Sequence, residues 1–141
     1  MATQAEASLT TTSEHAANLA LKKRFVAALS AGDWDTGASL MHPDFELREP
    51  DALPYGGTYK GIEGFKQCLG SIAAAHKTTQ METLHTYFAS DPDRIIGETY
   101  WRGVLHGSGR EAESKVIEQF EFRDGKILAI SVYWFDVPDY S

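Results

Sequence analysis

The second half of the chain changes its hydrophobic period, and this change restricts the fold more than any other feature. From Thr78 onward, apolar and polar residues follow the spacing of strands rather than that of helices. Asp91-Pro92-Asp93 and the polar loop 106–114 separate apolar runs, and Asp124-Gly125 is a strong signal for a two-residue hairpin turn. The sequence therefore predicts a meander of four strands, over residues 79–89, 94–105, 115–123 and 126–136.

The first half has helical spacing around one short strand. Leu21, Phe25 and Leu29 recur every four residues and form the apolar stripe of a first helix, with Lys22 largely off that stripe. Thr11 and Glu14 have the spacing of a capping box at its start. We expect helices over 14–31, 33–41 and 61–75, a strand over 42–50 and a turn-rich loop over 51–60.

This order of elements predicts an α+β fold, with three helices packed on one face of a curved, mostly antiparallel sheet. Three helices cannot cover both faces of such a sheet, so we expect the other face to be solvent-exposed or to form a subunit interface. Trp101, Tyr133 and Phe135 are predicted to lie on that second face, and apolar patches of this kind mark interfaces. We therefore expect a homodimer.

Charge and composition exclude several function classes. The chain of 141 residues carries 13 Lys and Arg against 20 Asp and Glu, a formal net charge of −7. This balance argues against nucleic-acid binding, which needs clustered cations, and against an anionic membrane surface. The single Cys68 excludes an internal disulfide framework, and the five histidines lack the spacing of a metal site.

The length suits a single domain. Residues 1–13 are rich in Ala, Thr and Ser, which predicts a flexible tail before a domain over 14–141. The start of the chain lacks a basic stretch followed by an apolar one, and no run has the length of a transmembrane helix. The expected compartment is the cytoplasm.

Two acids occupy strand positions that should face inward. Glu49 shares a face with Phe45 and Leu47, and Glu118 shares a face with Val116 and Phe120. A buried carboxylate without a partner raises its pKa until it is neutral, so two such acids indicate a pocket with acid–base chemistry.

A purely structural role for these acids is also open at this stage. Either acid can pair with Arg102 or Lys115, or reach water at the strand end beside Pro50.

Three segments resemble a known family. Residues 24–35 (RFVAALSAGDWD) are similar to the junction of the first two helices in ketosteroid isomerases and SnoaL-like polyketide cyclases, which belong to the nuclear transport factor 2-like superfamily. Residues 56–65 (GGTYKGIEGF) resemble the loop that opens the third helix, and 116–127 resemble the late hairpin. The resemblance covers residues 14–136. It implies a cone-shaped α+β barrel that encloses a deep pocket, commonly in a homodimer.

The resemblance also implies roles for individual residues. Glu49, before Pro50, takes the place of the proton-shuttling base, and we expect it to be ionised at neutral pH. Glu118 takes the place of an acid that donates a hydrogen bond to the developing enolate, or it orients Glu49 as a second carboxylate. Phe25 stands where the family has a tyrosine and cannot donate a hydrogen bond. A tyrosine of the 51–60 loop or a histidine is then expected to supply the missing donor.

Five further side chains are predicted to contact the substrate: Phe25, Trp34, Tyr55, Tyr59 and His85. Each has an alternative interpretation. Phe25 and Trp34 can be core residues, Tyr59 can pack at its loop, and Tyr55 can be exposed. His85 is either a base in the pocket or an exposed residue.

The sequence and the resemblance together predict a small-molecule enzyme that needs no cofactor. It would transfer a proton at the carbon next to a carbonyl, giving isomerisation, dehydration or aldol cyclisation. Aromatic walls and few cations favour a largely apolar, uncharged substrate. The alternative is a non-catalytic small-molecule-binding or dimerisation module with the same fold.

Overall fold

The computed structural model describes residues 12–141, so most of the predicted tail lies outside the described residues. Helix α2 (Ser13–Ser30) begins at the N-cap Thr12, whose hydroxyl accepts from the His15 backbone N–H at 3.2 Å. The His15 ring completes the capping box, because the Thr12 N–H lies 3.0 Å from its Nδ1. The cap predicted at Thr11 and Glu14 is therefore wrong by one residue. After α2, Gly32 has a φ of 72°, which lets the chain turn toward α3.

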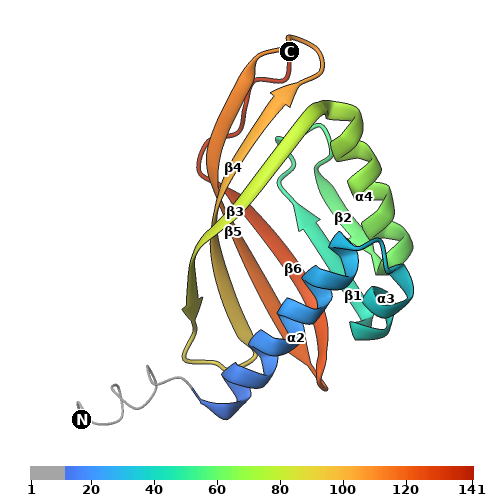
Figure 1. Ribbon diagram of the computed structural model, residues 1–141, viewed down its shortest axis with the longest axis vertical. Coiled ribbons are helices and arrows are strands. Elements are labelled where there is room, and N and C mark those ends of the chain that lie inside the picture. Colours follow the sequence, from blue (N-terminus) through green and yellow to red (C-terminus); the bar gives the residue numbers. More distant parts are fainter. Residues whose placement is uncertain (1–11) are drawn as a thin grey trace, which may run out of the picture.

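The other two helices lie where the sequence predicts them. Helix α3 (Trp34–Leu40) is capped by Asp33, whose carboxylate accepts from the Thr36 N–H at 3.1 Å. Helix α4 spans Gly61–Ala75. All three helices lie on the same side of the sheet (Figure 1).

Six strands form one open, mixed sheet in the order β2-β1-β6-β5-β4-β3. Every neighbouring pair is antiparallel except β1 with β6, which is parallel. The predicted α+β fold is confirmed, although the sheet does not close into a barrel, since β2 and β3 are free edges. The strands are β1 (Met41–Glu49), β2 (Gly57–Lys60), β3 (His76–Phe88), β4 (Arg94–Leu105), β5 (Glu111–Arg123) and β6 (Lys126–Trp134).

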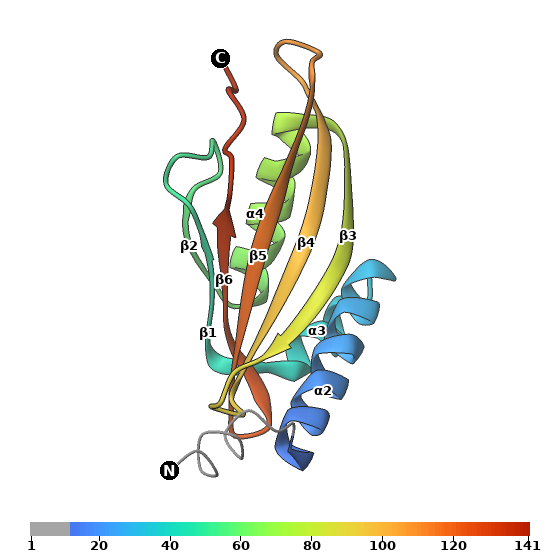
Figure 2. The same ribbon diagram turned by 90° about the vertical axis from the view of Figure 1, so that its left-hand side faces the viewer.

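The strand predictions need correction at three places. Strand β5 begins at Glu111, four residues earlier than expected, so it takes up part of the predicted 106–114 loop. The sequence indicates only a loop over 51–60, but its last four residues pair with the end of β1, from Glu49↔Gly57 to Glu46↔Lys60. Strand β3 begins at His76, directly after α4, three residues earlier than expected. Strands β3 to β5 are long and curved (Figure 2), and this curvature makes the sheet concave toward the helices.

The core fills the narrow part of this concave face. Phe25 of α2, Phe45 of β1 and Phe65 of α4 pack ring against ring, with centroids 5.9 to 6.3 Å apart. Trp101 of β4 is also on this face, with 3% of its surface exposed. Its predicted place in a dimer contact is therefore wrong, because the β3–β4 register turns its side chain toward the helices, opposite Met81.

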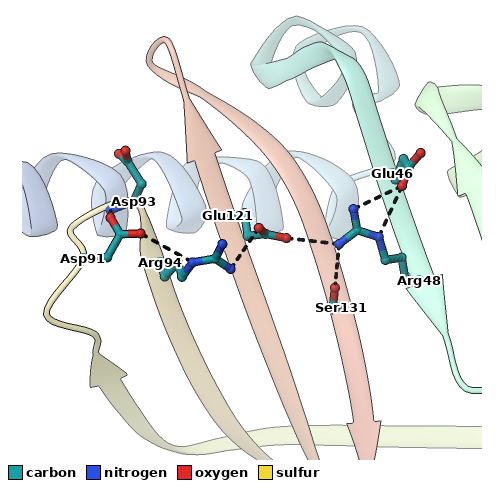
Figure 3. Close-up of polar contacts among 7 residues, drawn as sticks. All are labelled: Glu46, Arg48, Asp91, Asp93, Arg94, Glu121 and Ser131. Carbon is teal, nitrogen blue, oxygen red and sulfur yellow. Dashed lines mark hydrogen bonds and ion pairs between the residues drawn. The ribbon is translucent and has the colours of Figure 1, made fainter.

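The convex face carries a chain of charged groups instead (Figure 3). Glu121 of β5 bridges two arginines, with Arg94 Nη1 at 2.9 Å and Arg48 Nη1 at 3.1 Å. Arg48 also binds Glu46 at 3.2 Å, and Arg94 binds Asp91 at 3.4 Å. With the hydrogen bond that Arg48 Nη1 donates to Ser131 Oγ of β6 at 3.2 Å, these contacts link four neighbouring strands across the sheet and leave the opposite, concave face to the apolar residues.

Candidate active site

A cavity of about 520 Å³ lies between the helices and the concave face of the sheet. Its walls are mostly apolar, with Phe65 and Ile72 from α4 on one side and Phe120, Ile130 and Val132 from the sheet on the other. A second, smaller hollow of about 250 Å³ lies at the α3–α4 end of the molecule. The size and apolar walls of the larger cavity are typical of a small-molecule site.

The opening of the large cavity has an apolar rim. Val26 of α2, Leu69 of α4 and Met81 of β3 all line the cavity and are also 46%, 37% and 54% exposed. These three exposed side chains mark the point where α2, α4 and the edge strand β3 face one another. A ligand would therefore enter between the two helices and β3.

Glu49 and Glu118 both line this cavity. The register explains why they meet. Glu118 pairs with Val132 and with Gly97, and Glu49 follows Arg48, the partner of Ser131. One row therefore crosses β1, β6, β5 and β4 at Glu49, Val132, Glu118 and Gly97, and the three side chains in it lie on the concave face.

Glu49 is held in its neutral form. Burial and the nearby Glu118 carboxylate together raise its pKa from 4.5 to about 8, and the neighbouring indole N–H of Trp134, which is not in hydrogen-bond geometry with the carboxyl, opposes this rise. Our expectation of an ionised Glu49 at neutral pH is therefore wrong for most of the population. The ionised minority is a strong base, because a carboxylate with a high pKa binds a proton tightly.

Glu118 has a cationic neighbour that the sequence did not indicate. Burial raises the pKa of Glu118, and the ammonium of Lys22 lowers it. Neither cation proposed from the sequence is its partner, since Arg102 binds Glu111 at 2.9 Å on the convex face and Lys115 is exposed.

Lys22 itself is buried, with 9% of its surface exposed, and it lines the cavity from α2. Burial lowers its pKa, while Glu118 raises it. The expected position of Lys22 off the apolar stripe is wrong, because Lys22 and Phe25 are three residues apart and share one face of α2.

Unpaired polar atoms gather at this cavity. Among the described residues, three buried side-chain atoms have no hydrogen-bond partner, namely Glu49 Oε2, Thr99 Oγ1 and Trp134 Nε1. All three belong to residues that line the cavity. Because buried polar groups in proteins are almost always paired, this concentration indicates a site that receives polar groups of a ligand.

A hydrogen-bonded chain of tyrosine and histidine side chains starts at Tyr55, which lines the cavity. Tyr55 is 3% exposed, and burial and a hydrogen bond with Tyr140 raise its pKa. The Tyr140 hydroxyl lies 2.8 Å from His76 Nε2, and His76 Nδ1 lies 2.8 Å from the Ile72 carbonyl oxygen. Burial lowers the pKa of His76, so its neutral ring donates to Ile72 and accepts from Tyr140.

The structure separates the five predicted contact residues into two groups. Phe25 and Tyr55 line the cavity, whereas Trp34, Tyr59 and His85 do not. Trp34 lies under the Lys66 ammonium, 5.5 Å from its ring centroid, and the Tyr59 hydroxyl donates to the Tyr55 carbonyl at 2.8 Å. His85 is on the exposed face of β3, with Nε2 3.9 Å from Glu98, because a bulge between Thr83 and His85 shifts the register.

The lining residues that sequence reasoning missed include Lys22, Thr99, Trp101 and Trp134. Alternation along β4 puts Thr99 and Trp101 on one face, so this pair could have been found once the inward face was known. Among residues 12–141, no three His, Cys, Asp or Glu side chains gather as metal ligands. None of the helices in this range is long and apolar enough to cross a membrane.

Comparison with known proteins identifies the class. The chain has the nuclear transport factor 2-like fold, and residues 23–130 match the SnoaL-like domain. It belongs to the SnoaL-like domain family. An uncharacterized protein of Mycobacterium tuberculosis, Rv0034, is 27% identical over 125 residues, covering 85% of this chain and 90% of the relative.

Two solved structures share the fold with ligands bound. TerC, co-crystallized with polyporic acid, superposes with a TM-score of 0.70 at 21% identity, over 84% of this chain and 91% of its own. RV0760c from Mycobacterium tuberculosis, in complex with estradiol-17beta-hemisuccinate, gives a TM-score of 0.62 at 21% identity, over 82% of this chain and 92% of its own.

Proposed function

We propose that this protein is a cofactor-independent enzyme that transfers a proton at the carbon next to a carbonyl group, with Glu49 as the general base. One observation carries the proposal. Glu49 presents an unpaired carboxyl oxygen in an apolar cavity, beside a second acid, and burial raises its pKa to about 8. A base of this kind suits the removal of a weakly acidic C–H proton near neutral pH.

The proton and electrons balance in a simple cycle. The Glu49 carboxylate takes a proton from the α-carbon, the electron pair of the broken C–H bond forms a C=C bond to the carbonyl carbon, and the carbonyl π electrons move onto the oxygen to give an enolate. Glu49 then returns the proton to a different carbon in an isomerisation. In a dehydration it passes the proton to the departing hydroxyl, which leaves as water while the enolate electrons reform the carbonyl and a C=C bond. In a cyclisation the enolate carbon attacks a second carbonyl, and Glu49 gives its proton to the alkoxide that forms there.

Small-molecule ligands in related structures support an apolar ligand body. Two proteins of the same fold bind polyporic acid and estradiol-17beta-hemisuccinate. The cavity of about 520 Å³ has room for a molecule with one or more rings, and its aromatic and aliphatic walls favour one.

The test measures hydrogen exchange directly. A panel of β,γ-unsaturated ketones and β-hydroxy ketones is incubated with the protein in D2O, and NMR follows the loss of α-protons. Glu49→Gln should lower the exchange rate about 10²–10⁴-fold, because the amide cannot accept a proton. Glu82→Gln, on the exposed face of β3, is the matched control and should leave the rate unchanged.

The pH profile gives an independent check. With a pKa of about 8 for Glu49, kcat/KM should rise nearly tenfold per pH unit below pH 7 and level off above pH 8. If Glu49→Gln exchanges α-protons as fast as the wild type, Glu49 is not the base. If ketones bind by calorimetry but no α-proton exchanges, the proposal fails and the non-catalytic binding module is the better description.

We also propose a homodimer in the cytoplasm. Tyr133 is 55% exposed on the convex face, next to the half-buried Ile117, and these side chains offer an apolar contact beside the charged network. Sedimentation equilibrium at micromolar concentration should give twice the chain mass of 15.6 kDa. A mass of one chain would contradict the dimer.

A further inference from the structure

The ammonium of Lys22 occupies a small space on the concave face of the sheet, between the Phe120 ring and Gly97. We call this space the seat of Lys22. The Lys22 Nζ is 4.7 Å from the centroid of the Phe120 ring, a cation–π distance. A Cβ built at Gly97 would lie 3.1 Å from the same atom, which is tighter than ordinary van der Waals contact. Glycine at this position therefore leaves the space that the ammonium occupies, directly beside Glu118 in the same row of the sheet.

This seat leaves the N–H donors of Lys22 unused. In the part of the chain that the structure describes, no hydrogen bond and no direct ion pair holds the ammonium, although Glu118 acts on it electrostatically. The Lys22 Nζ is not among the enclosed atoms without a partner, so the ammonium is open to the cavity and its three N–H donors are free to bind a ligand there. Because Lys22 lines the cavity, a bound molecule can reach these donors.

The hydroxyl of Thr99 is a second unpaired group on the part of the cavity wall where the Lys22 ammonium lies. Thr99 is 2% exposed, and its hydroxyl has no hydrogen-bond partner. Thr99 follows Gly97 by two residues on β4, so its side chain points to the same face about 7 Å further along the strand. Both donors therefore lie on the same part of the cavity wall, where an anionic group of a bound ligand can accept from them.

We propose that Lys22 and Thr99 form a binding site for an anionic oxygen, so that the cavity takes ligands with an apolar ring body and one carboxylate or enolate oxygen. This inference rests on the proposed function for its enolate form, and it replaces the expected uncharged substrate with a more specific class. The charge of Lys22 supports an anion over a neutral carbonyl, because hydrogen bonds between charged partners are the stronger ones. Within residues 12–141, no other lysine, arginine or histidine lines the cavity.

A matched pair of ligands tests the proposal without any turnover. 2-Naphthoate and 2-naphthamide have nearly the same shape, differ in charge, and have no exchangeable α-proton. Calorimetric titration of the full-length protein at pH 7 should show naphthoate binding about tenfold to a hundredfold more tightly than naphthamide. Since neither probe can be enolised, this result is independent of whether Glu49 is a base.

Variants then assign the preference to named groups. Lys22→Met with Glu118→Gln removes both charges of the pair, so no uncompensated charge is left in the cavity. This double variant should bind naphthamide as the wild type does and lose the preference for naphthoate, and Thr99→Val should reduce it severalfold. Lys23→Met, the neighbouring exposed lysine of α2, is the matched control and should keep the full preference.

Three outcomes would overturn the proposal. The first is equal or tighter binding of naphthamide to the wild type. The second is an unchanged preference for naphthoate in a double variant that circular dichroism shows to be folded. The third is binding of neither probe at millimolar concentration to the folded wild type, because the cavity would then not accept an aromatic carboxylate.

Discussion

Replacing Glu49 by glutamine should change the pH dependence of stability in a way that the structure fixes in sign. The wild-type carboxyl has a pKa of about 8 in the folded protein, against an ordinary value of 4.5. The folded state therefore holds this proton more tightly than the unfolded state. By linkage, the stability of the wild type falls as pH rises from about 4.5 and stops falling once the pH passes about 8.

The size of this effect follows from the two pKa values. A difference between 4.5 and about 8, at 1.36 kcal/mol for each pKa unit, corresponds to roughly 5 kcal/mol. Glutamine has nearly the same shape and stays neutral at every pH. At pH 5 the free energies of unfolding of the wild type and Glu49→Gln should differ by less than about 1 kcal/mol. At pH 9 the free energy of unfolding of Glu49→Gln should be higher by several kcal/mol.

Urea denaturation at pH 5 and pH 9 measures this difference. Glu82→Gln serves as the control for a carboxylate lost from the surface, and its stability relative to the wild type should be the same at both pH values within about 0.5 kcal/mol. If Glu49→Gln shows no gain in relative stability between pH 5 and pH 9, Glu49 is not desolvated as described. A loss of stability at pH 9 would instead indicate a structural ion pair involving Glu49.

Two other substitutions test the geometry at separate places. Glu121→Ala should lower the free energy of unfolding by about 2 kcal/mol, because it removes the carboxylate that bridges Arg48 and Arg94. Urea denaturation measures this loss of stability, and high salt should make it smaller. Gly97→Ala should change the melting temperature little, since the atom that its Cβ would meet is the mobile end of Lys22. The same variant should lose most of the preference for naphthoate, and an unchanged preference would show that the ammonium does not need this seat.

Period and alternation predict most of the fold, and the reason is local. Strands that bury one face alternate strictly, so Glu49 and Glu118 could be recognised as inward-facing acids from their neighbours alone. The strand β2 was missed because its four residues include Gly57, with a φ of 125°, and its pairing depends on β1 rather than on its own sequence. His85 was uncertain for a related reason, since a bulge in β3 reverses the alternation just before it.

Lys22 was missed for a different physical reason. A lysine next to two other basic residues on a surface helix is normally solvated, and no property of α2 alone indicates otherwise. Its burial depends on Gly97 and Phe120, about 75 and 98 positions later in the chain, which provide the space and the aromatic face for its ammonium. Such a site needs the tertiary contact and cannot be read from the helix.

In the proposed reaction, Lys22, Glu49 and Glu118 together allow an apolar site to handle a charged intermediate. Before the reaction, the ionised Glu49 carries the negative charge at one end of the row that continues through Glu118 to the seat of Lys22. When Glu49 takes a proton it becomes neutral, and the charge passes to the enolate oxygen of the ligand. If that oxygen is bound by Lys22, the net charge of the cavity stays the same throughout the step, and only its position changes. This is the arrangement that a region of low dielectric favours, because moving a charge toward a fixed cation avoids the large cost of creating a new buried charge.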